Sequence, residues 1–391
     1  MALPTKTFVV APAAPAQATG TNIILRRLLA NFDPRDIVVL ARRPDRRSAL
    51  DSTGLPYPVI MPPSVPRTWR GQRYWSLLAS LPAACIGQAA AKRHAASVIL
   101  GMFPDEASLL TAYMVHRWTG LPLVAYFCDL YMEDRRGWQA RLARWLQPRV
   151  FRAAARILVM NEGMRDYYWS KYGLDAVCLP ACINTAIPTL KPPTIGGPQC
   201  IVGYSGNINT TRVGSLRALL AAIGDDRTIV LRYFTPQTPD DLRRLGVWHA
   251  SASAEFVGDE EDLIRRLAAC DILFLPLAFE SEEHHRDQLA TSFATKSFEY
   301  FLSRKPILLH APADSFIARF YRERGCGLVV DDPSPAALAV GLKRLRDDDV
   351  LRSSLVVRAL EATREFEGPV VARRLIDHLK SAAGAGKRVR R

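Results

Sequence analysis

Short apolar runs alternate with longer amphipathic stretches along most of the chain. Five runs in the first half predict buried strands, at residues 7–11, 36–43, 96–103, 122–130 and 155–161. The stretches between them carry apolar side chains at helical spacing, as Ile24, Leu28 and Leu29 do after the first run. Continuous apolar strands separated by helices are typical of a parallel sheet that helices cover on both faces.

A stretch rich in proline and glycine, Thr189–Gln199, interrupts this pattern and predicts an interdomain linker. The alternation then restarts, with strands expected at 200–208, 228–234, 254–258, 271–277 and 306–312 and helices at 215–223, 260–269 and 295–303. We therefore predict an α/β fold of two Rossmann-like, doubly wound domains that face a cleft. The expected boundaries are 1–190 for the N-terminal domain, 199–370 for the C-terminal domain, and 371–391 for a helix end with a basic, disordered tail.

Composition and charge narrow the class of protein. Hydrophobic residues make up 49% and charged residues 23% of the chain, which is ordinary globular usage and excludes wholesale disorder. The formal charge of +14 is uneven, because residues 1–195 hold 24 basic and 12 acidic side chains while residues 196–391 hold 28 and 26. The N-terminal half is therefore expected to face a membrane surface, an acidic substrate or nucleic acid. No nucleic-acid reader motif accompanies the charge, so we expect no nucleic-acid partner.

Cysteine usage and hydropathy predict the compartment. The seven cysteines are scattered from Cys85 to Cys326 without a pairing pattern or a zinc-ligand spacing, which predicts reduced thiols and a cytoplasmic protein. No run is apolar enough to span a bilayer. The sequence EHHR, residues 283–286, lacks a third ligand at a known spacing, so we expect no metal and interpret it as a loop over a ligand site.

The segment TSFATKSFEYFLSRKP, residues 291–306, holds the strongest candidate chemistry. Small residues precede a predicted helix, whose N-terminal N–H groups and positive dipole end suit a diphosphate. Glu299 follows about one turn later and is placed to accept hydrogen bonds from a ribose diol. The alternative is an amphipathic helix with a solvated glutamate.

This segment continues to Leu309 and resembles the donor-site helix of GT-B-fold glycosyltransferases, specifically glycosyltransferase family 4 and its relatives. Three further stretches agree in order and spacing: GLPLVAYFCDLY from Gly120, RAAARILVMNEGMRDYYWSKYG from Arg152, and FVGDEEDLIRRLAACDILFLPL from Phe256. The resemblance covers most of residues 120–309 and implies a nucleotide-diphosphate sugar as the donor substrate, with neither a bound cofactor nor a metal.

The resemblance assigns donor-binding roles in the segment 291–299. Glu299 matches the second of two family glutamates, which contacts the ribose, whereas Thr291 stands in the place of the first, which contacts the sugar. Backbone N–H groups around Phe293, Ala294 and Thr295 would hold the diphosphate and sugar, and Lys296 would supply charge. Glu280 and Glu282 are alternatives for the missing glutamate.

A second set of donor contacts is expected in GYSGNINTTRVG, residues 203–214, which resembles the family's phosphate clamp. Gly206 matches its first glycine, Asn207 replaces its arginine and Arg212 keeps the charge of its lysine. Arg212 and Lys296 are therefore the candidate cations for the leaving diphosphate, although Arg212 also fits an exposed loop arginine. The glycine of the family's F-x-G strand is Gly258.

On the N-terminal side, Asp129 stands where a strand ends, and it either orients substrate hydroxyls or caps the next segment. Some family members have a His–Asp pair there, but here Cys128 precedes the aspartate. Gly20 lies in the first strand–helix loop, which in the family approaches the phosphates and the acceptor. An ordinary turn glycine is the alternative.

Two segments of the N-terminal half interleave arginines with aromatic residues. Residues 67–75 hold three arginines with Trp69, Tyr74 and Trp75, and residues 135–161 hold seven arginines and no acidic residue. Pro148 is expected to divide the second segment into two helices. Cations beside aromatics suit a lipid headgroup region, which predicts a peripheral protein at an anionic membrane surface, on the inner face. Solvated arginines around buried tryptophans are the alternative.

Together these features predict a glycosyltransferase that moves a sugar from a nucleotide-diphosphate sugar to a lipid-linked or polysaccharide acceptor, with retention as the resemblance implies. Asp129, Arg212 and Lys296 are the candidate catalytic residues. A GT-B-fold sugar-nucleotide epimerase, or a degenerate subunit that binds nucleotide sugars without catalysis, are the alternatives.

Overall fold

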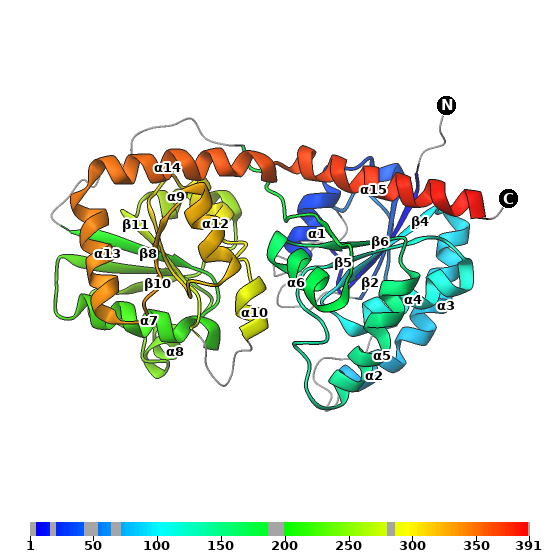
Figure 1. Cartoon of the computed structure of the whole chain (residues 1–391), viewed down its shortest axis with the longest axis horizontal. Helices are drawn as coiled ribbons and strands as arrows, with labels where there is room; N and C mark the ends of the chain where they lie inside the picture. The colour runs from blue at the N-terminus through cyan, green and yellow to red at the C-terminus, as the bar shows by residue number, and fades with distance from the viewer. Residues whose placement is uncertain are drawn as a thin grey trace. The chain divides into compact units, whose positions relative to one another are not determined.

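The computed structural model describes residues 5–15, 21–42, 54–63, 72–186, 199–279 and 286–389. The chain forms two compact units. Unit 1 comprises Met1–Asn184 and Phe366–Arg391, and unit 2 comprises Thr185–Glu365. In each unit, helices cover a twisted parallel sheet (Figure 1).

Unit 1 is built on a seven-stranded sheet in the order β3-β2-β1-β4-β5-β6-β7, and every pairing is parallel. Its strands are β1 (Thr7–Ala11), β2 (Ile37–Ala41), β3 (Val59–Ile60), β4 (Val98–Phe103), β5 (Leu123–Phe127), β6 (Arg156–Val159) and β7 (Val177–Cys178). Its helices are α1 (Thr21–Leu29), η1 (Pro34–Asp36), α2 (Gln72–Leu78), α3 (Ser80–Arg93), α4 (Glu106–Thr119), α5 (Gly137–Ala153), α6 (Glu162–Tyr172) and α15 (Gly368–Val389). The strand order reverses at β1, which pairs with both β2 and β4.

Unit 2 contains a six-stranded parallel sheet in the order β10-β9-β8-β11-β12-β13. Its strands are β8 (Cys200–Ser205), β9 (Ile229–Phe234), β10 (Ser253–Glu255), β11 (Ile272–Pro276), β12 (Ile307–His310) and β13 (Leu328–Val330). Its helices are α7 (Thr210–Ile223), α8 (Pro239–Arg244), α9 (Glu260–Ala268), α10 (Arg286–Thr291), α11 (Ser297–Leu302), α12 (Phe316–Arg324), α13 (Pro335–Asp347), α14 (Asp349–Thr363) and η3 (Arg364–Phe366). Here the order reverses at β8, between β9 and β11.

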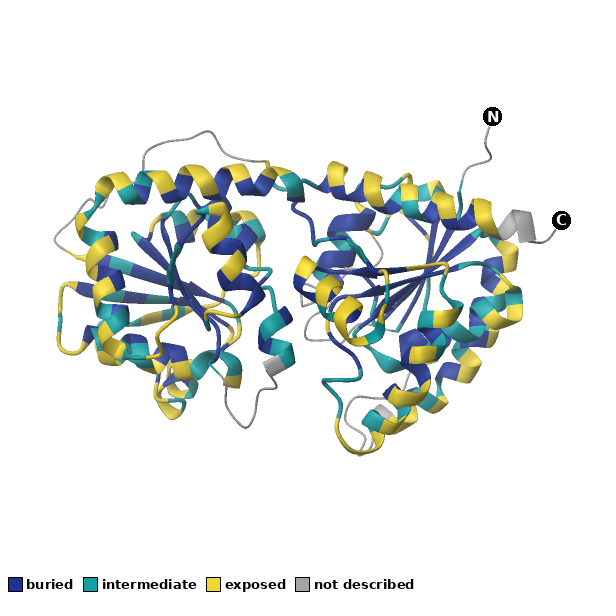
Figure 2. Cartoon of the chain, in the orientation of Figure 1, coloured by how far each residue is buried: buried dark blue, intermediate teal, exposed yellow. Residues whose placement is uncertain are grey.

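Burial explains why these runs form central strands. All residues of β1, β2, β4, β5, β11 and β12 are buried, whereas the covering helices turn an exposed face outward (Figure 2). A strand that is covered on both faces must be apolar at every position rather than at alternate ones. The predicted α/β fold of two doubly wound domains is therefore confirmed. Three short strands, β3, β7 and β13, were not expected.

Residues 366–391 belong to unit 1. The expected boundary instead placed residues up to 370 in the second domain. The amide of Ile183 donates to the carbonyl of Phe366 at 2.8 Å, and the amide of Gly368 donates to the carbonyl of Ile183 at 2.8 Å. These bonds attach the start of α15 to Ile183, near the end of the N-terminal part of unit 1. Helix α15 also packs against α1, β4 and β5. The helix end and disordered tail expected at 371–391 form a single helix as far as Val389.

Helix α5 is continuous through Pro148, so the expected division into two helices is wrong. Proline removes a single N–H from the helix ladder, and the apolar face on both sides of it, at Leu146 and Val150, is fully buried. The buried Gln147 also anchors this turn, because its Oε1 accepts from the amide of Met132 at 3.0 Å. Tertiary packing thus outweighs the lost hydrogen bond. Among the described helices, none is both long and apolar enough to cross a membrane.

Candidate functional site

The loop after β8 comes within contact distance of the segment that precedes α11. Gly206 has φ = +102°, a backbone conformation that side chains rarely adopt, and its amide donates to the carbonyl of Phe234 at 2.9 Å. A Cβ atom at this position would lie 2.9 Å from Nζ of Lys296. Gly206 therefore provides both the turn and the space that the lysine occupies, and the structure brings these two candidate residues together.

Lys296 is held by hydrogen bonds to the end of β8. Its ammonium group donates to the carbonyl oxygen of Ser205 at 2.5 Å and to the hydroxyl of Tyr204 at 3.1 Å, and it lies 4.3 Å from the centre of the Tyr204 ring. Burial lowers the pKa of Lys296 well below its usual value, and the charge of Arg212 lowers it further against the pull of Glu299. Because an ammonium has three N–H donors, one donor remains for a ligand.

Arg212, in the first turn of α7, is the second cation of this region. Its Nη1 donates to the carbonyl of Pro276 at the end of β11, at 2.9 Å, and burial lowers its pKa. The guanidinium group has five N–H donors, so most of them are not used by this contact. Two partly desolvated cations that repel each other are stabilised by an anion placed between them.

The N-terminus of α7 opens onto the same loop. Asn209 stands at the N-cap but its side chain makes no capping bond; instead its Oδ1 accepts from the hydroxyl of Thr211 at 2.6 Å. No acidic side chain lies in the first turn of this 14-residue helix. By contrast, Asp259 caps the N-terminus of α9, and the first turn of α9 contains Glu260. Uncapped N–H groups and the positive end of the helix dipole favour an anion there.

Asn207 has a structural contact in place of the cation that the family pattern puts at this position. Its Oδ1 accepts from Nε2 of Gln237 at 2.6 Å, and its carbonyl accepts from the hydroxyl of Tyr204 at 3.0 Å. Gln237 follows β9, and its Nε2 also donates to the carbonyl of Ile208 at 2.8 Å. Asn207 and Gln237 therefore brace the loop after β8 against the loop after β9. Sequence reasoning missed both Tyr204 and Gln237.

The residues predicted to bind the donor around α10 and α11 differ in their burial and in their contacts. Thr291 is buried, and its hydroxyl donates to the carbonyl of Asp287 within α10 at 3.0 Å. Phe293 packs against Phe320, with ring centres 5.2 Å apart. Among the residues that the structure describes, none accepts a hydrogen bond from the amide of Ala294, which lies before the start of α11.

The amides of Thr295 and Lys296 likewise meet no acceptor in the described part of the chain. Glu299 lies one turn further along, half-buried, on the same short helix. The N–H groups of this loop are therefore available to a ligand, as is one donor of the Lys296 ammonium group.

An exposed aromatic side chain follows β10, the edge strand on the β9 side of β8. Phe256 follows β10 directly and is 71% exposed, and a Cβ on Gly258 would lie 3.5 Å from its ring. The amide of Thr235, after β9, donates to the carbonyl of Glu255 at 2.8 Å, which connects the ends of β10 and β9. Phe256 therefore presents a ring face at the same sheet edge as Gly206. Phe256 lies inside the strand expected at 254–258, so its exposed position after β10 was not predicted.

In unit 1, Asp129 lies just beyond the end of β5 with its side chain exposed. The protein around the carboxyl group still displaces part of its water, and this desolvation, followed by the charge of Asp134, raises the pKa of Asp129 to about 6 against the pull of Arg135. Arg135 forms an ion pair with Glu106 and donates to the carbonyl of Pro104 at 3.1 Å. Gly20 lies outside the described residues.

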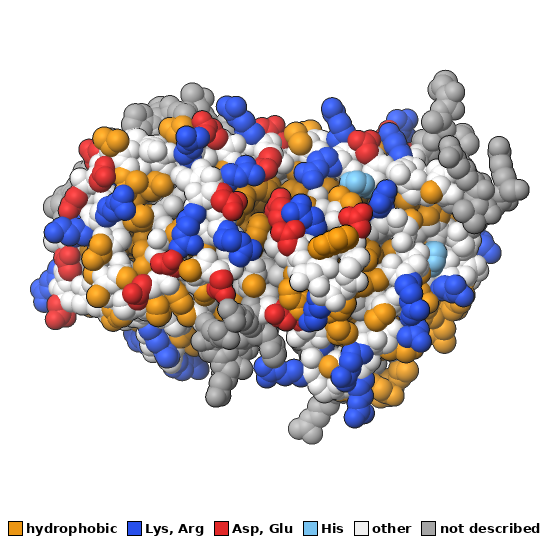
Figure 3. Space-filling view, in the orientation of Figure 1, with side chains coloured by type: hydrophobic (Ala, Val, Ile, Leu, Met, Phe, Trp, Pro, Cys, Tyr) orange, Lys and Arg blue, Asp and Glu red, His pale blue; other side chains and the backbone are white. Residues whose placement is uncertain are grey.

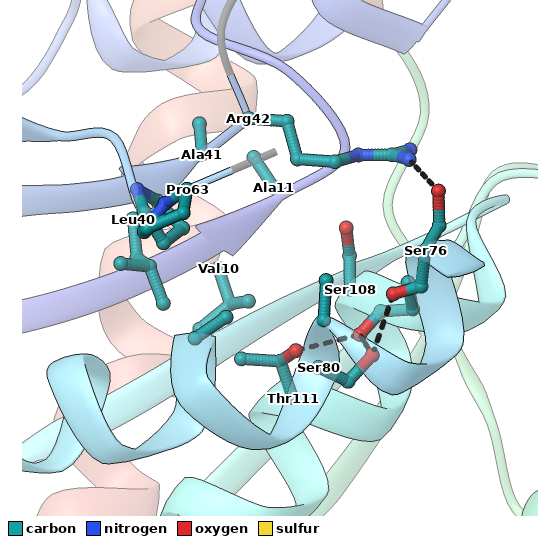
Figure 4. A pocket seen from close by; sticks show the side chains of 14 residues that line it. Val10, Ala11, Leu40, Ala41, Arg42, Pro63, Ser76, Ser80, Ser108 and Thr111 are labelled. Atoms are coloured by element: carbon teal, nitrogen blue, oxygen red, sulfur yellow. Dashed lines mark hydrogen bonds between the residues drawn. The ribbon is translucent and has the colours of Figure 1, made fainter. Parts of the chain in front are cut away.

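A cavity of about 30 Å³ opens where β1 and β2 end in unit 1 (Figure 4). Small side chains line most of it, including Ala11, Ala41, Ala83 and Ala107. At its rim Arg42 donates to the hydroxyl of Ser76 at 3.3 Å and to Oδ1 of Asp105 at 2.7 Å. The carboxyl ends of parallel strands are the usual position of ligands in such sheets. No sequence motif marks the residues that line this cavity.

Among the described residues, no group of three or more His, Cys, Asp or Glu side chains could hold a metal ion. The sequence EHHR, apart from the backbone of Arg286, and the alternatives Glu280 and Glu282 lie outside these residues.

Comparison with known proteins assigns the fold. A sucrose-phosphate synthase from Thermosynechococcus elongatus superposes with a TM-score of 0.72 at 14% identity, over 97% of this chain and 100% of that one. Anabaena HepE, solved in complex with UDP and glucose, superposes with a TM-score of 0.70 at 14% identity, over 96% and 100%. The chain has the GT-B fold. Residues 19–178, all in unit 1, also match the family model of the glycosyl transferase 4-like domain.

The resemblance to GT-B glycosyltransferases that the sequence motifs indicated is therefore confirmed. The GT-B fold also occurs in another reaction class. A putative UDP-N-acetylglucosamine 2-epimerase from Listeria monocytogenes superposes with a TM-score of 0.58 at 11% identity, over 97% of this chain and 96% of that one. A search of curated proteins found no match. The fold alone does not decide the reaction, so the chemistry must be argued from the site.

Proposed function

We propose that this protein is a glycosyltransferase that moves a sugar, with retention, from a nucleotide-diphosphate sugar to a lipid-linked or polysaccharide acceptor. The observation that carries the proposal is the pair of cations in unit 2. Lys296 and Arg212 both have lowered pKa values because they are desolvated, and both keep N–H donors that no described residue uses. Such a pair stabilises the negative charge that develops on a leaving nucleoside diphosphate.

The remaining groups of unit 2 fit the other parts of that donor. The N-terminus of α7 and the amides of Thr295 and Lys296 suit the diphosphate, and the carboxylate of Glu299 suits a ribose diol. The exposed ring of Phe256 offers a stacking surface for a nucleobase. HepE, which shares the fold, was solved with UDP and glucose, and this supports a nucleotide sugar as the ligand class.

We place the acceptor on unit 1, where the cavity at the ends of β1 and β2 and the carboxylate of Asp129 lie at the carboxyl edge of the sheet. A carboxylate there accepts hydrogen bonds from acceptor hydroxyls, and the alanine-lined cavity suits apolar atoms. The family match to the glycosyl transferase 4-like domain covers this part of the chain and supports the assignment.

A cationic face on α2 and α5 supports an acceptor at a membrane. We define it by the exposed side chains of Tyr74, Trp75, Trp138, Arg141 and Arg144. The rings of Tyr74 and Trp138 lie 6.4 Å apart in an edge-to-face arrangement, so the two helices present one surface. Basic and apolar side chains lie together over this part of unit 1 in Figure 3. Exposed aromatics beside arginines suit the headgroup region of an anionic membrane.

Calorimetric titration with UDP- and GDP-sugars tests the donor site. We expect one of them to bind, and we expect Glu299→Gln to weaken binding about 10- to 150-fold, because a lost charge-assisted hydrogen bond costs ~1.5–3 kcal/mol. The exposed Glu361→Gln is the matched control and should bind as the parent does. Absence of binding across the panel would favour a non-catalytic subunit, and unchanged affinity of the Glu299 variant would remove the ribose assignment.

The reaction is tested by incubating the enzyme with the bound donor, first alone and then with acceptor lipids or oligosaccharides. Transfer that requires an acceptor, with an NMR coupling that matches the donor's anomeric configuration, is the expected result. Epimer formation from the nucleotide sugar alone would favour the epimerase alternative instead.

Sedimentation with vesicles tests the cationic face. We expect binding to anionic vesicles that weakens with salt, and little binding to zwitterionic ones, since each basic residue near an anionic leaflet contributes ~1 kcal/mol. The double variant Arg141→Ser and Arg144→Ser should lose binding, while Arg227→Ser with Arg265→Ser in unit 2 removes the same charge and should not. Equal binding to both lipid types, or equal loss in both double variants, would contradict the assignment.

A further inference from the structure

A second cavity of unit 1, about 260 Å³ in volume, opens at the amino ends of β1 and β2. We call it the amino-edge pocket. Three chain segments bring polar side chains to it: Lys6 just before β1, Asp36 at the end of η1, and His94 at the C-terminus of α3. Arg35 also lines it. Nothing in the proposed transfer reaction uses any of these residues.

The amino-edge pocket is separate from the cavity at the ends of β1 and β2. The strands of this sheet are parallel, so all their amino ends lie at one edge and all their carboxyl ends at the other. Five residues of β1 separate Lys6 from the residues after Ala11, and at ~3.3 Å per residue this amounts to roughly 16 Å. A monosaccharide-sized ligand in the amino-edge pocket cannot also contact the carboxyl edge.

The polar side chains of the amino-edge pocket have unused hydrogen-bonding capacity. Lys6, Asp36 and His94 are half-buried, and none of their side chains makes a hydrogen bond or ion pair with any residue that the structure describes. Arg35 directs Nε and Nη2 at Asp33, with Nη2 2.6 Å from Oδ2, and this leaves Nη1 available. The pocket thus combines an ammonium, an imidazole and part of a guanidinium group with the carboxylate of Asp36, whose charge also acts on Arg35.

This combination selects a class of ligand. Lys6, His94 and Nη1 of Arg35 suit the oxygens of a phosphate group, while the carboxylate of Asp36 repels phosphate and accepts hydrogen bonds from hydroxyl groups. Pro34, Pro56 and Pro58 line the same pocket and offer apolar surface to C–H groups. The volume lies just below the ~300–1,000 Å³ of pockets for drug-sized ligands, so a monosaccharide is a better fit than a nucleotide sugar.

We propose that the amino-edge pocket is a second ligand site that binds a small phosphorylated sugar. Its position away from the carboxyl edges makes this ligand an effector rather than a substrate. The proposal does not depend on the transfer reaction, because it rests on residues of a different edge of unit 1.

Calorimetry on the full-length protein tests the site with three probes: glucose 6-phosphate, inorganic phosphate and glucose. We expect glucose 6-phosphate to bind more tightly than either of the others. Lys6→Gln and His94→Gln should each weaken it about tenfold or more, since each removes a charge-assisted hydrogen bond. Arg93→Gln, next to His94 on the exposed end of α3, does not line the pocket and is the matched control.

Asp36→Asn separates a sugar phosphate from phosphate alone. We expect it to weaken glucose 6-phosphate but not inorganic phosphate, because only the sugar offers hydroxyl donors to the carboxylate. Competition with UDP-glucose, which should not displace glucose 6-phosphate, distinguishes this pocket from the donor site. No binding of glucose 6-phosphate, unchanged affinity in both Lys6→Gln and His94→Gln variants that melt as the parent does, or equal loss in Arg93→Gln would overturn the proposal.

Discussion

Replacement of Lys296 by methionine tests the cation pair directly. The side chain keeps nearly the same length and loses the ammonium group, whose donors are divided between Ser205, Tyr204 and one unused position. Because two of the three donors stay with the protein, a bound diphosphate gains a single charge-assisted hydrogen bond from Lys296. Loss of one such bond costs ~1.5–3 kcal/mol, which corresponds to about 10- to 150-fold weaker binding of the donor.

The assay is calorimetric titration of the parent and the variant with the nucleotide sugar that the parent binds. Lys305→Met is the matched control, because burial also lowers the pKa of Lys305 but this residue precedes β12, at the amino edge of the sheet. We expect the control to bind the donor as the parent does. Equal affinity of the Lys296 and parent proteins, or an equal loss in both methionine variants, would show that Lys296 does not hold the diphosphate.

A second measurement on the same variant concerns pH. Since the folded protein lowers the pKa of Lys296, the unfolded chain binds this proton more tightly, and the contribution of the group to stability rises with pH until the unfolded lysine also loses its proton. Urea unfolding of the parent at several alkaline pH values should include this rise, and the methionine variant should lack it. An unchanged pH dependence would mean that the ammonium group is not desolvated.

Three further predictions concern single positions. Gly206→Ala should lower stability by ~1 kcal/mol or more and weaken donor binding, because a Cβ there meets Nζ of Lys296 at 2.9 Å and φ is +102°; thermal unfolding and titration measure both effects. Activity should rise with pH through about 6 as Asp129 ionises, with no such rise in Asp129→Asn. Because the pKa of Asp129 is higher in the folded protein than in the unfolded chain, the parent should lose stability as pH rises from about 4 to 6, and the variant should not. Phe256→Ala should weaken UDP-glucose binding by ~1–3 kcal/mol while leaving the melting temperature unchanged, and equal binding would exclude base stacking.

The fold could be predicted from the sequence wherever a strand is buried along its whole length. β1, β4 and β11 are buried at every position and almost entirely apolar, so their runs stand out from the amphipathic helices. β3 and β7 contain two residues each, and such short strands leave no periodicity to detect. The course of the chain after residue 365 was also missed, because membership of α15 in unit 1 depends on bonds between Ile183 and residues nearly two hundred positions away.

The candidate site was predicted in part for the same physical reason. Gly206 and Lys296 could be named from motifs, but the contact of Lys296 with Tyr204 depends on a distance between segments that are 92 positions apart. Thr291 stands where the family pattern has a glutamate, and its hydroxyl bonds within α10, which could not be predicted without knowing where that helix ends. A spacing pattern gives the type of residue at a position, whereas the partners of its side chain come from packing.

The two crossings of the chain between the units have a consequence for how the protein can be divided. The first crossing leaves unit 1 after Asn184 and the second returns to it at Phe366, so the C-terminal helix α15 completes a unit that begins at the other end of the chain. A fragment of residues 1–190 would lack that helix, and the apolar faces of α1, β4 and β5 that it covers would be exposed to water. Conversely, a cut between residues 187 and 198 should yield two polypeptides that stay together as a non-covalent complex, since the second still carries α15, docked on the first.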